Sequence, residues 1–188
     1  EGHLRRAIER NEFVLHYQPK ADLRTGEITG VEALLRWQRP GHGLIAPDRF
    51  VSVLEETGLI LPVGAWVIRA ACQQLAAWDR LGLPPVRLAV NLSARQFRHQ
   101  YLASLIEDSL RENTIEPDRL EIELTESLLM EDNETTRAMF EHFRRIGVRV
   151  AIDDFGTGYS SLSYIKRFNV DSLKIDRSFV QSLPDNDE

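Results

Sequence analysis

Polar side chains recur where short apolar segments of this chain end. A lone ionised carboxylate costs free energy to bury in an apolar strand, and several carboxylates that converge repel one another. A divalent cation removes both costs, and the oxygen atoms of Glu, Asp and Asn suit hard ions such as Mg²⁺ and Mn²⁺. The residues placed in this way are Glu32, Asn91, Glu123, Glu126, Asp153, Asp154, Lys174 and Asp176.

The acidic members of this set predict a site for two divalent ions. Glu32, Glu123 and the Asp153-Asp154 pair together carry four negative charges, which two divalent cations neutralise. The sequence has no cluster of Cys and His residues, which argues against structural zinc. We therefore expect two Mg²⁺ or Mn²⁺ ions per site.

The alternation of side chains along strands adds detail to this site. Residues two apart on a strand share a face. Glu32 and Arg36 therefore project together, and an acid that holds a metal beside an Arg makes a phosphodiester clamp. Lys174 and Asp176 also share a face. The loop at 155–162 holds two glycines and favours a hinge over a phosphate-binding loop.

Each of these features also has a simpler interpretation. The Asp153-Asp154 pair can be a turn before Gly156, and Asn91-Leu92-Ser93 can be a helix-capping loop. Lys174 can pair with a surface acid, and Glu121 is expected to face solvent, like most single acids on strands. The coincidence of several polar strand ends favours a functional site over these separate interpretations.

Strand and helix signals alternate along the chain. Strands are expected at residues 13–19, 28–37, 86–92, 120–125, 148–153 and 172–175, and helices at 4–10, 47–56, 63–81, 101–111, 134–146 and 160–168. This order predicts βα units and a mostly parallel sheet, with the polar strand ends gathered at one edge. A closed eight-stranded barrel usually needs about 250 residues, so the chain fits a barrel without its last units or an open doubly wound sheet.

The composition is that of an ordinary globular protein. The 188 residues are 43% hydrophobic with net charge −6, and no stretch reaches the roughly 20 apolar residues of a membrane span. An acidic surface disfavours DNA and RNA but allows a small anionic ligand in a metal-containing pocket. The single Cys72 excludes an internal disulfide, fits a reducing cytoplasm and is expected to be a buried thiol. The N-terminus lacks a signal-peptide pattern and reads as the middle of a longer polypeptide, and the acidic tail after Pro184 is expected to be disordered.

Six motifs, in their order and spacing, resemble the EAL domain family of bacterial cyclic di-GMP phosphodiesterases. They are Tyr17-Gln18-Pro19, Glu32-Ala33-Leu34, Asn91-Leu92-Ser93, Glu123-Leu124-Thr125-Glu126, Asp153-Asp154-Phe155-Gly156-Thr157-Gly158 and Lys174-Ile175-Asp176. The resemblance covers essentially all 188 residues. It implies an α/β domain at 1–188 that is a modified TIM (β/α)8 barrel with an antiparallel first strand.

The resemblance also implies a role for each motif residue. The first metal ion is bound by Glu32, Asn91, Glu123 and Asp153. The second is shared by Asp153 and Asp154, and Lys174 holds or polarises the attacking water. Glu126 anchors the loop after Asp154. The residues expected to bind substrate phosphate and guanine are Gln18, Arg36 and Asp176.

The implied reaction is in-line attack by a metal-activated hydroxide on phosphorus, which converts cyclic di-GMP to linear pGpG. Two alternatives are a catalytically inactive cyclic di-GMP receptor and an interaction domain that binds no nucleotide. The intact Arg36 and Gln18 count against the second alternative. The family's later Glu-Gly-Val-Glu and Gln-Gly motifs would fall after Glu188, so we expect the last two βα units to be absent from this C-terminally incomplete domain.

The resemblance further implies a homodimer that forms near the helix after the Gly156–Gly158 loop, which carries Tyr164 and Ile165. It implies fusion to sensory or GGDEF-type domains in a longer chain. The domain is expected to lie in the cytoplasm without contacting a membrane or a DNA or RNA polymer, although the parent protein can be membrane-anchored.

Overall fold

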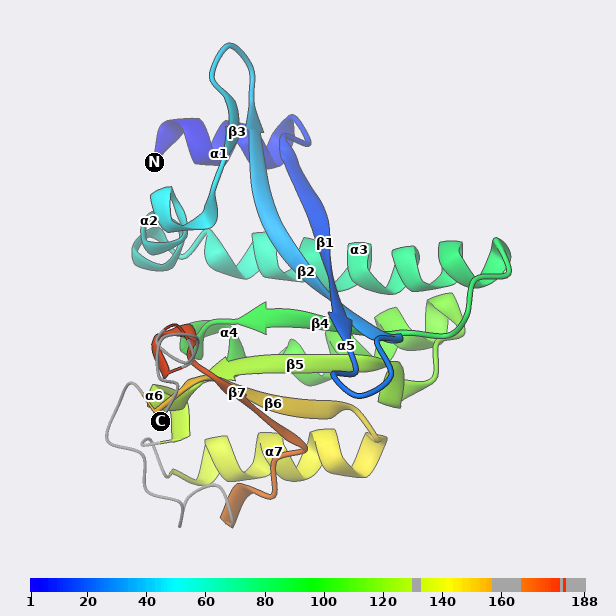
Figure 1. The fold of residues 1–188 in the computed structure, drawn as a ribbon. Helices are drawn as coiled ribbons and strands as arrows, with labels where there is room; N and C mark the ends of the chain where they lie inside the picture. Colours follow the sequence, from blue (N-terminus) through cyan, green and yellow to red (C-terminus); the bar gives the residue numbers. More distant parts are fainter. Residues whose placement is uncertain (130–132, 157–166, 180, 182–188) are drawn as a thin grey trace.

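One mixed sheet organises the molecule, in a computed structural model that describes residues 1–129, 133–156, 167–179 and 181 (Figure 1). The strand order is β1-β2-β4-β5-β6-β7, and β3 pairs with β2 beside this path. The strands are β1 (Phe13–Ala21), β2 (Ile28–Arg39), β3 (Gly43–Ile45), β4 (Arg87–Leu92), β5 (Leu120–Thr125), β6 (Arg149–Phe155) and β7 (Ser172–Ile175). β1 runs antiparallel to β2, whereas the pairs from β2–β4 to β6–β7 are parallel. The α/β fold with an antiparallel first strand is therefore confirmed.

Helices follow the strands in the expected βα order. They are α1 (Gly2–Glu9), α2 (Val51–Thr57), α3 (Ile60–Arg80), α4 (Ala94–Phe97), α5 (Leu102–Asn113), α6 (Glu126–Leu129) and α7 (Glu134–Ile146), with 3₁₀ turns at Pro47–Arg49, Pro117–Arg119 and Arg177–Phe179. The helix expected at 47–56 is split, because Phe50 leaves helical geometry between the 3₁₀ turn and α2. The short elements β3, α4 and α6 were not expected, since three or four residues carry too little periodicity to reveal them.

Two sequence-based expectations fall largely outside the described residues. Of the helix expected at 160–168, only residues 167 and 168 are described, and both are helical. The acidic tail after Pro184 lies entirely outside the described residues.

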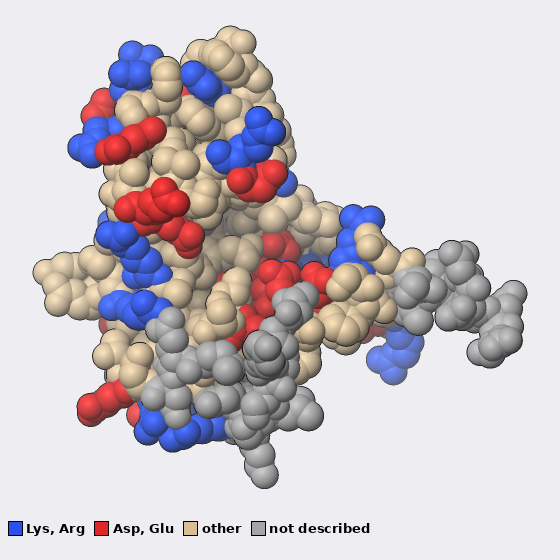
Figure 2. Space-filling view, turned by 90° about the vertical axis from the view of Figure 1, so that its left-hand side faces the viewer, with Lys and Arg blue, Asp and Glu red and all other residues tan. Residues whose placement is uncertain are grey.

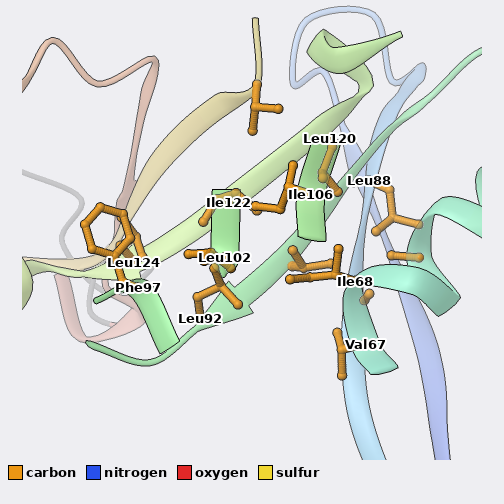
Figure 3. Close-up of a cluster of buried hydrophobic side chains, with 14 of the residues drawn as sticks. Val67, Ile68, Leu88, Leu92, Phe97, Leu102, Ile106, Leu120, Ile122 and Leu124 are labelled. Carbon is orange, nitrogen blue, oxygen red and sulfur yellow. The ribbon is translucent and has the colours of Figure 1, made fainter. Parts of the chain in front are cut away.

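The outward face of the sheet forms the hydrophobic core. Leu88, Val90 and Leu92 of β4 and their neighbours on β5 are buried against α3, α4 and α5, as Figure 3 shows. The residues between them on β4, Ala89 and Asn91, point to the opposite, concave face. Successive side chains of a strand point to opposite faces, so the residues that pack in the core differ from those that point to the concave face.

Helix α3 differs from the sequence-based expectation about membrane spans. Among the described residues, it is the one helix long and apolar enough, by length and composition, to cross a bilayer. It packs in the core instead, where Ile68, Cys72 and Leu75 have no exposed surface. The expected buried thiol is therefore confirmed, and burial raises the pKa of the Cys72 thiol to about 12.

The segment after Asn91 is fixed by a capping box on α4. The Ser93 hydroxyl accepts from the Gln96 backbone N–H (3.4 Å), and the Gln96 side chain accepts from the Ser93 backbone N–H (3.0 Å). Gln96 is 6% exposed and lies against Gly64 of α3. A Cβ at position 64 would come within 1.6 Å of Gln96 Nε2. The glycine in α3 therefore makes the space that the cap of α4 occupies.

We predict that Gly64→Ala destabilises the protein, although Ala replaces Gly in a helix. Helix propensity favours Ala by about 1 kcal/mol, but displacement of Gln96 breaks the cap and strands a buried amide, which costs about 2–3 kcal/mol. Urea denaturation should show a net loss of about 1–2 kcal/mol. In a Gln96→Ala background the same substitution should no longer destabilise. A Gly64→Ala protein more stable than the parent would contradict the prediction.

Candidate metal centre

Three carboxylates from three strands converge on the ammonium group of Lys174. Its Nζ donates to Glu123 Oε2 (2.7 Å), Asp153 Oδ2 (3.0 Å) and Glu32 Oε2 (3.2 Å). One oxygen from each of the three acids lies within 4.8 Å of the others. Figure 2, which views the carboxyl ends of the parallel strands, shows acidic side chains gathered in a hollow there. The structure therefore brings these predicted residues together.

Asn91 joins this cluster through Glu32. Its side-chain Nδ2 donates to Glu32 Oε1 (2.8 Å). Asn91 also pairs in register with Glu123 on the neighbouring strand. The amide therefore orients one carboxylate and lies beside a second, as a shared ligand set requires.

Glu121, expected to face solvent, is buried instead, so that expectation was wrong. It is 6% exposed, and its Oε1 accepts from Lys20 (2.9 Å) while its Oε2 accepts from Ser172 (3.3 Å). Glu121 lies two residues before Glu123, so both acids point to the concave face. The same alternation that pairs Glu32 with Arg36 identifies this acid, whereas its partner Lys20 was missed by sequence reasoning.

The pKa values of the cluster follow from burial and charge. Burial raises the pKa of Glu123, even though Lys174 and Lys20 donate to it. Burial also acts to raise the pKa of Glu32, but the hydrogen bond from Asn91 and the charge of Lys174 lower it below the ordinary value. Burial acts against the charge of Lys174, yet the bond to Glu123 raises the pKa of this lysine well above its usual range. Lys174 is therefore a cation here.

The backbone turns sharply after Asp153. Asp154 adopts a left-handed φ of 54°, and its N–H donates to Asp153 Oδ1 (3.0 Å). Its side chain is exposed beside the cluster, and burial and the neighbouring Asp153 charge raise the pKa of Asp154. The structure thus places both aspartates of the pair at the same strand end, with only Asp153 in the group of converging oxygens.

Glu126 holds the backbone that follows this turn. It is 7% exposed at the start of α6, and its Oε2 accepts from the Gly156 N–H (3.2 Å). Gly156 has a φ of 101°, and a Cβ there would lie 2.7 Å from the ring of Phe179. Only glycine fits this position. The hydrogen bond from its N–H to Glu126 fixes where the chain leaves β6. The remainder of the predicted hinge, 157–162, lies outside the described residues.

The residues expected to bind substrate surround the cluster without joining it. Gln18 is exposed on β1 and pairs in register with Glu32. Arg36 is half-buried, and its guanidinium donates to the Leu35 carbonyl (2.8 Å). Its backbone position lies four residues, roughly 13 Å, along β2 from that of Glu32. Asp176 accepts from the Ser178 N–H (2.9 Å) and hydroxyl, and these bonds lower the pKa of Asp176.

A cleft of about 480 Å³ reaches one of the three converging carboxylates, that of Glu123. Asn91 and Glu123 line one wall, and apolar residues such as Leu34, Val51 and Ile60 line much of the rest. This size lies within the usual range for small-molecule sites. The arrangement offers an apolar surface for a flat ring and an acidic end for cations.

The donor set fits magnesium or manganese. Glu32, Asn91, Glu123 and Asp153 present oxygen donors, which hard divalent ions prefer. The three carboxylates already hold a cation, the Lys174 ammonium, at one point. Like charges buried so close together need such compensation. The residues therefore fit the metal that the resemblance implies.

Comparison with known proteins places this geometry in a family. The EAL domain model matches residues 1–188. The chain belongs to the EAL domain family. It is 47% identical over 180 residues to the bifunctional diguanylate cyclase/cyclic di-GMP phosphodiesterase MucR of Pseudomonas aeruginosa. The aligned region covers 96% of this chain and 26% of MucR. It is 45% identical over 183 residues to the cyclic di-GMP phosphodiesterase PdeR of Escherichia coli, and the aligned region covers 97% of this chain and 27% of PdeR. The chain thus spans about a quarter of these EAL proteins.

Solved EAL structures share the fold. The MucR phosphodiesterase in complex with c-di-GMP has 46% identity and a TM-score of 0.92, over 98% of this chain and 75% of that one. The Xanthomonas citri FimX EAL domain in complex with c-di-GMP has 25% identity and a TM-score of 0.87, over 98% and 72%. The TIM-barrel-like expectation is therefore confirmed.

We predict that Glu126→Ala frees the backbone at the end of β6. The Gly156 N–H loses its acceptor, so its hydrogen exchange should accelerate at least tenfold, while the core amides of β5 keep their protection. Amide exchange followed by NMR measures both. Glu134→Ala, at an exposed acid on α7, is the matched control and should leave Gly156 unchanged. Unaltered exchange in Glu126→Ala would show that the bond does not hold the loop.

Proposed function

We propose that this EAL domain hydrolyses one phosphodiester bond of cyclic di-GMP and releases linear pGpG. The observation that carries the proposal is the convergence of Glu32, Glu123 and Asp153 on one point beside a cleft. The names of MucR and PdeR, which describe cyclic di-GMP phosphodiesterases, support the choice of substrate.

Two Mg²⁺ or Mn²⁺ ions complete the proposed site. Glu32, Asn91, Glu123 and Asp153 would hold the first, and Asp153 with Asp154 would hold the second. When bound, such ions supply Lewis acidity toward the phosphate and lower the pKa of water.

The other side chains bind and orient. The Lys174 ammonium has N–H donors but no acceptor, so it would position a water rather than remove its proton. Arg36 is suited to a substrate phosphate and Gln18 to a guanine edge, since both lie on the strand pair that carries Glu32. Asp176, two residues after Lys174, adds an acceptor.

We further propose that the domain acts within a longer, multidomain protein, as its share of MucR and PdeR indicates. Sensory or GGDEF-type domains would then control it, in the cytoplasm. The proposed homodimer contacts at Tyr164 and Ile165 lie outside the described residues.

We predict that Asp153→Asn, Glu123→Gln and Glu32→Ala each weaken Mn²⁺ binding more than tenfold, since each removes one negatively charged carboxylate from the converging group. Calorimetric titration measures this. Glu55→Gln is the matched control, because Glu55 lines the same cleft but is absent from the converging group. Undiminished Mn²⁺ affinity in the three variants would show that these acids are not ligands.

We predict that Arg36→Ala and Lys174→Met separate binding from turnover. Arg36→Ala should weaken cyclic di-GMP binding about tenfold or more, because it removes a guanidinium that donates hydrogen bonds to a substrate phosphate. It should leave Mn²⁺ affinity intact, because an arginine cannot ligate a cation. Lys174→Met should lower the rate of pGpG formation more than nucleotide affinity. Chromatographic detection of pGpG and calorimetry provide the two readouts. A wild-type protein that binds cyclic di-GMP with Mn²⁺ yet forms no pGpG would instead be a receptor.

A further inference from the structure

Lys20 reaches from the first strand to the middle of the sheet. Its Nζ donates to Glu123 Oε1 (2.6 Å) and to Glu121 Oε1 (2.9 Å), both on β5, although β2 and β4 lie between the two strands. The bonds to the two acids raise the pKa of Lys20 despite its burial. This lysine therefore spans the concave face as a cation.

The path of Lys20 is open because the residues beneath it are small. Lys20 pairs in register with Gly30 on β2, where any Cβ would lie 3.2 Å from the Arg87 carbonyl oxygen. On β4, Ala89 pairs with both Glu32 and Glu121 and is 1% exposed. A larger inward side chain at either place would occupy the space that a lysine needs to reach β5.

The two lysines divide the oxygens of Glu123 between them. Oε2 accepts from Lys174, which also donates to Glu32 and Asp153, whereas Oε1 accepts from Lys20. The Glu123 side chain has no exposed surface, so its oxygens depend on the two lysines rather than on bulk water for hydrogen bonds. The bond from Lys20 therefore holds one oxygen and fixes the orientation in which Glu123 presents the other oxygen to the neighbouring acids.

We propose that Lys20 is a positioning residue that holds one oxygen of Glu123 and so fixes the orientation in which the other oxygen is presented to the metal. The proposal rests on the metal site of the proposed function and adds a residue outside its ligands. Partners that hydrogen bond to metal ligands typically change metal affinity or activity by roughly 10–100-fold when they are removed. We expect a change of that size here.

The rival explanation is that Lys20 only balances the charge of buried acids. Glu121 offers a way to separate the two roles. Lys20→Met/Glu121→Gln removes one positive and one negative charge, so the net charge around Glu123 stays the same while Oε1 loses its donor. Glu121→Gln alone keeps the bond from Lys20 to Glu123 and is the matched control.

The experiment measures Mn²⁺ affinity by calorimetry, thermal melting without metal, and pGpG formation over a range of Mn²⁺ concentrations. The double variant should melt cooperatively and bind Mn²⁺ roughly 10–100-fold more weakly. High Mn²⁺ should restore much of its turnover, which a fault in the fold would not allow. Glu121→Gln should bind Mn²⁺ as the wild type does.

Other outcomes overturn the proposal. Wild-type Mn²⁺ affinity in the double variant would mean that Lys20 only balances charge. If that variant does not fold, Lys20→Met/Glu121→Met replaces both polar partners by apolar ones, and failure of this variant to fold would assign Lys20 to the fold alone. A wild-type protein that binds no Mn²⁺ would refute the proposed metal site itself, and the wild-type titration detects that case separately.

Discussion

The fully buried carboxylate of Glu123 is the interaction on which the concave face depends. Burying a charge is costly unless it is paired and hydrogen bonded, and Glu123 satisfies this requirement with two lysines. Lys20 comes from β1 and Lys174 from β7, which lie at opposite ends of the strand order. Both can reach one carboxylate on β5 only because the sheet curves strongly. The same ion pairs thus compensate the buried charge and join the two outermost strands of the described sheet.

This arrangement places the chemistry and the hydrophobic core on opposite faces of the same strands. On β5, Leu120, Ile122 and Leu124 pack outward against helices, while Glu121 and Glu123 point inward. A strand buried on both sides normally reads as a continuous apolar run. Here the polar alternation persists because the inner residues find partners across the face, so the stability of the core and the charge pattern of the site are set by separate residues.

The sequence was informative where polar residues end strands, and less so where a contact spans several strands. Glu32 and Asp153 could be grouped in advance, because parallel strands place their carboxyl ends together. Lys20 escaped notice because its partners lie 101 and 103 residues away, on a strand that is not its neighbour. Glu121 was misjudged because single acids on strands usually face water, a rule that fails on a concave face. The direction of β1 came from the family resemblance, since periodicity does not distinguish a parallel from an antiparallel strand.

The hydrogen bonds from Lys174 to three carboxylates also bear on how the proposed metal site would select cations. Any metal ion that binds Glu32, Glu123 and Asp153 competes with an ammonium that already satisfies the same oxygens. A metal affinity at these oxygens would therefore be a difference between two sets of interactions rather than the strength of one. A monovalent ion offers these carboxylates no more charge than Lys174 does, whereas a divalent ion offers twice as much. In the proposed metal site, Lys174 would therefore favour divalent over monovalent cations, and it compensates the charge of the three acids in the metal-free state.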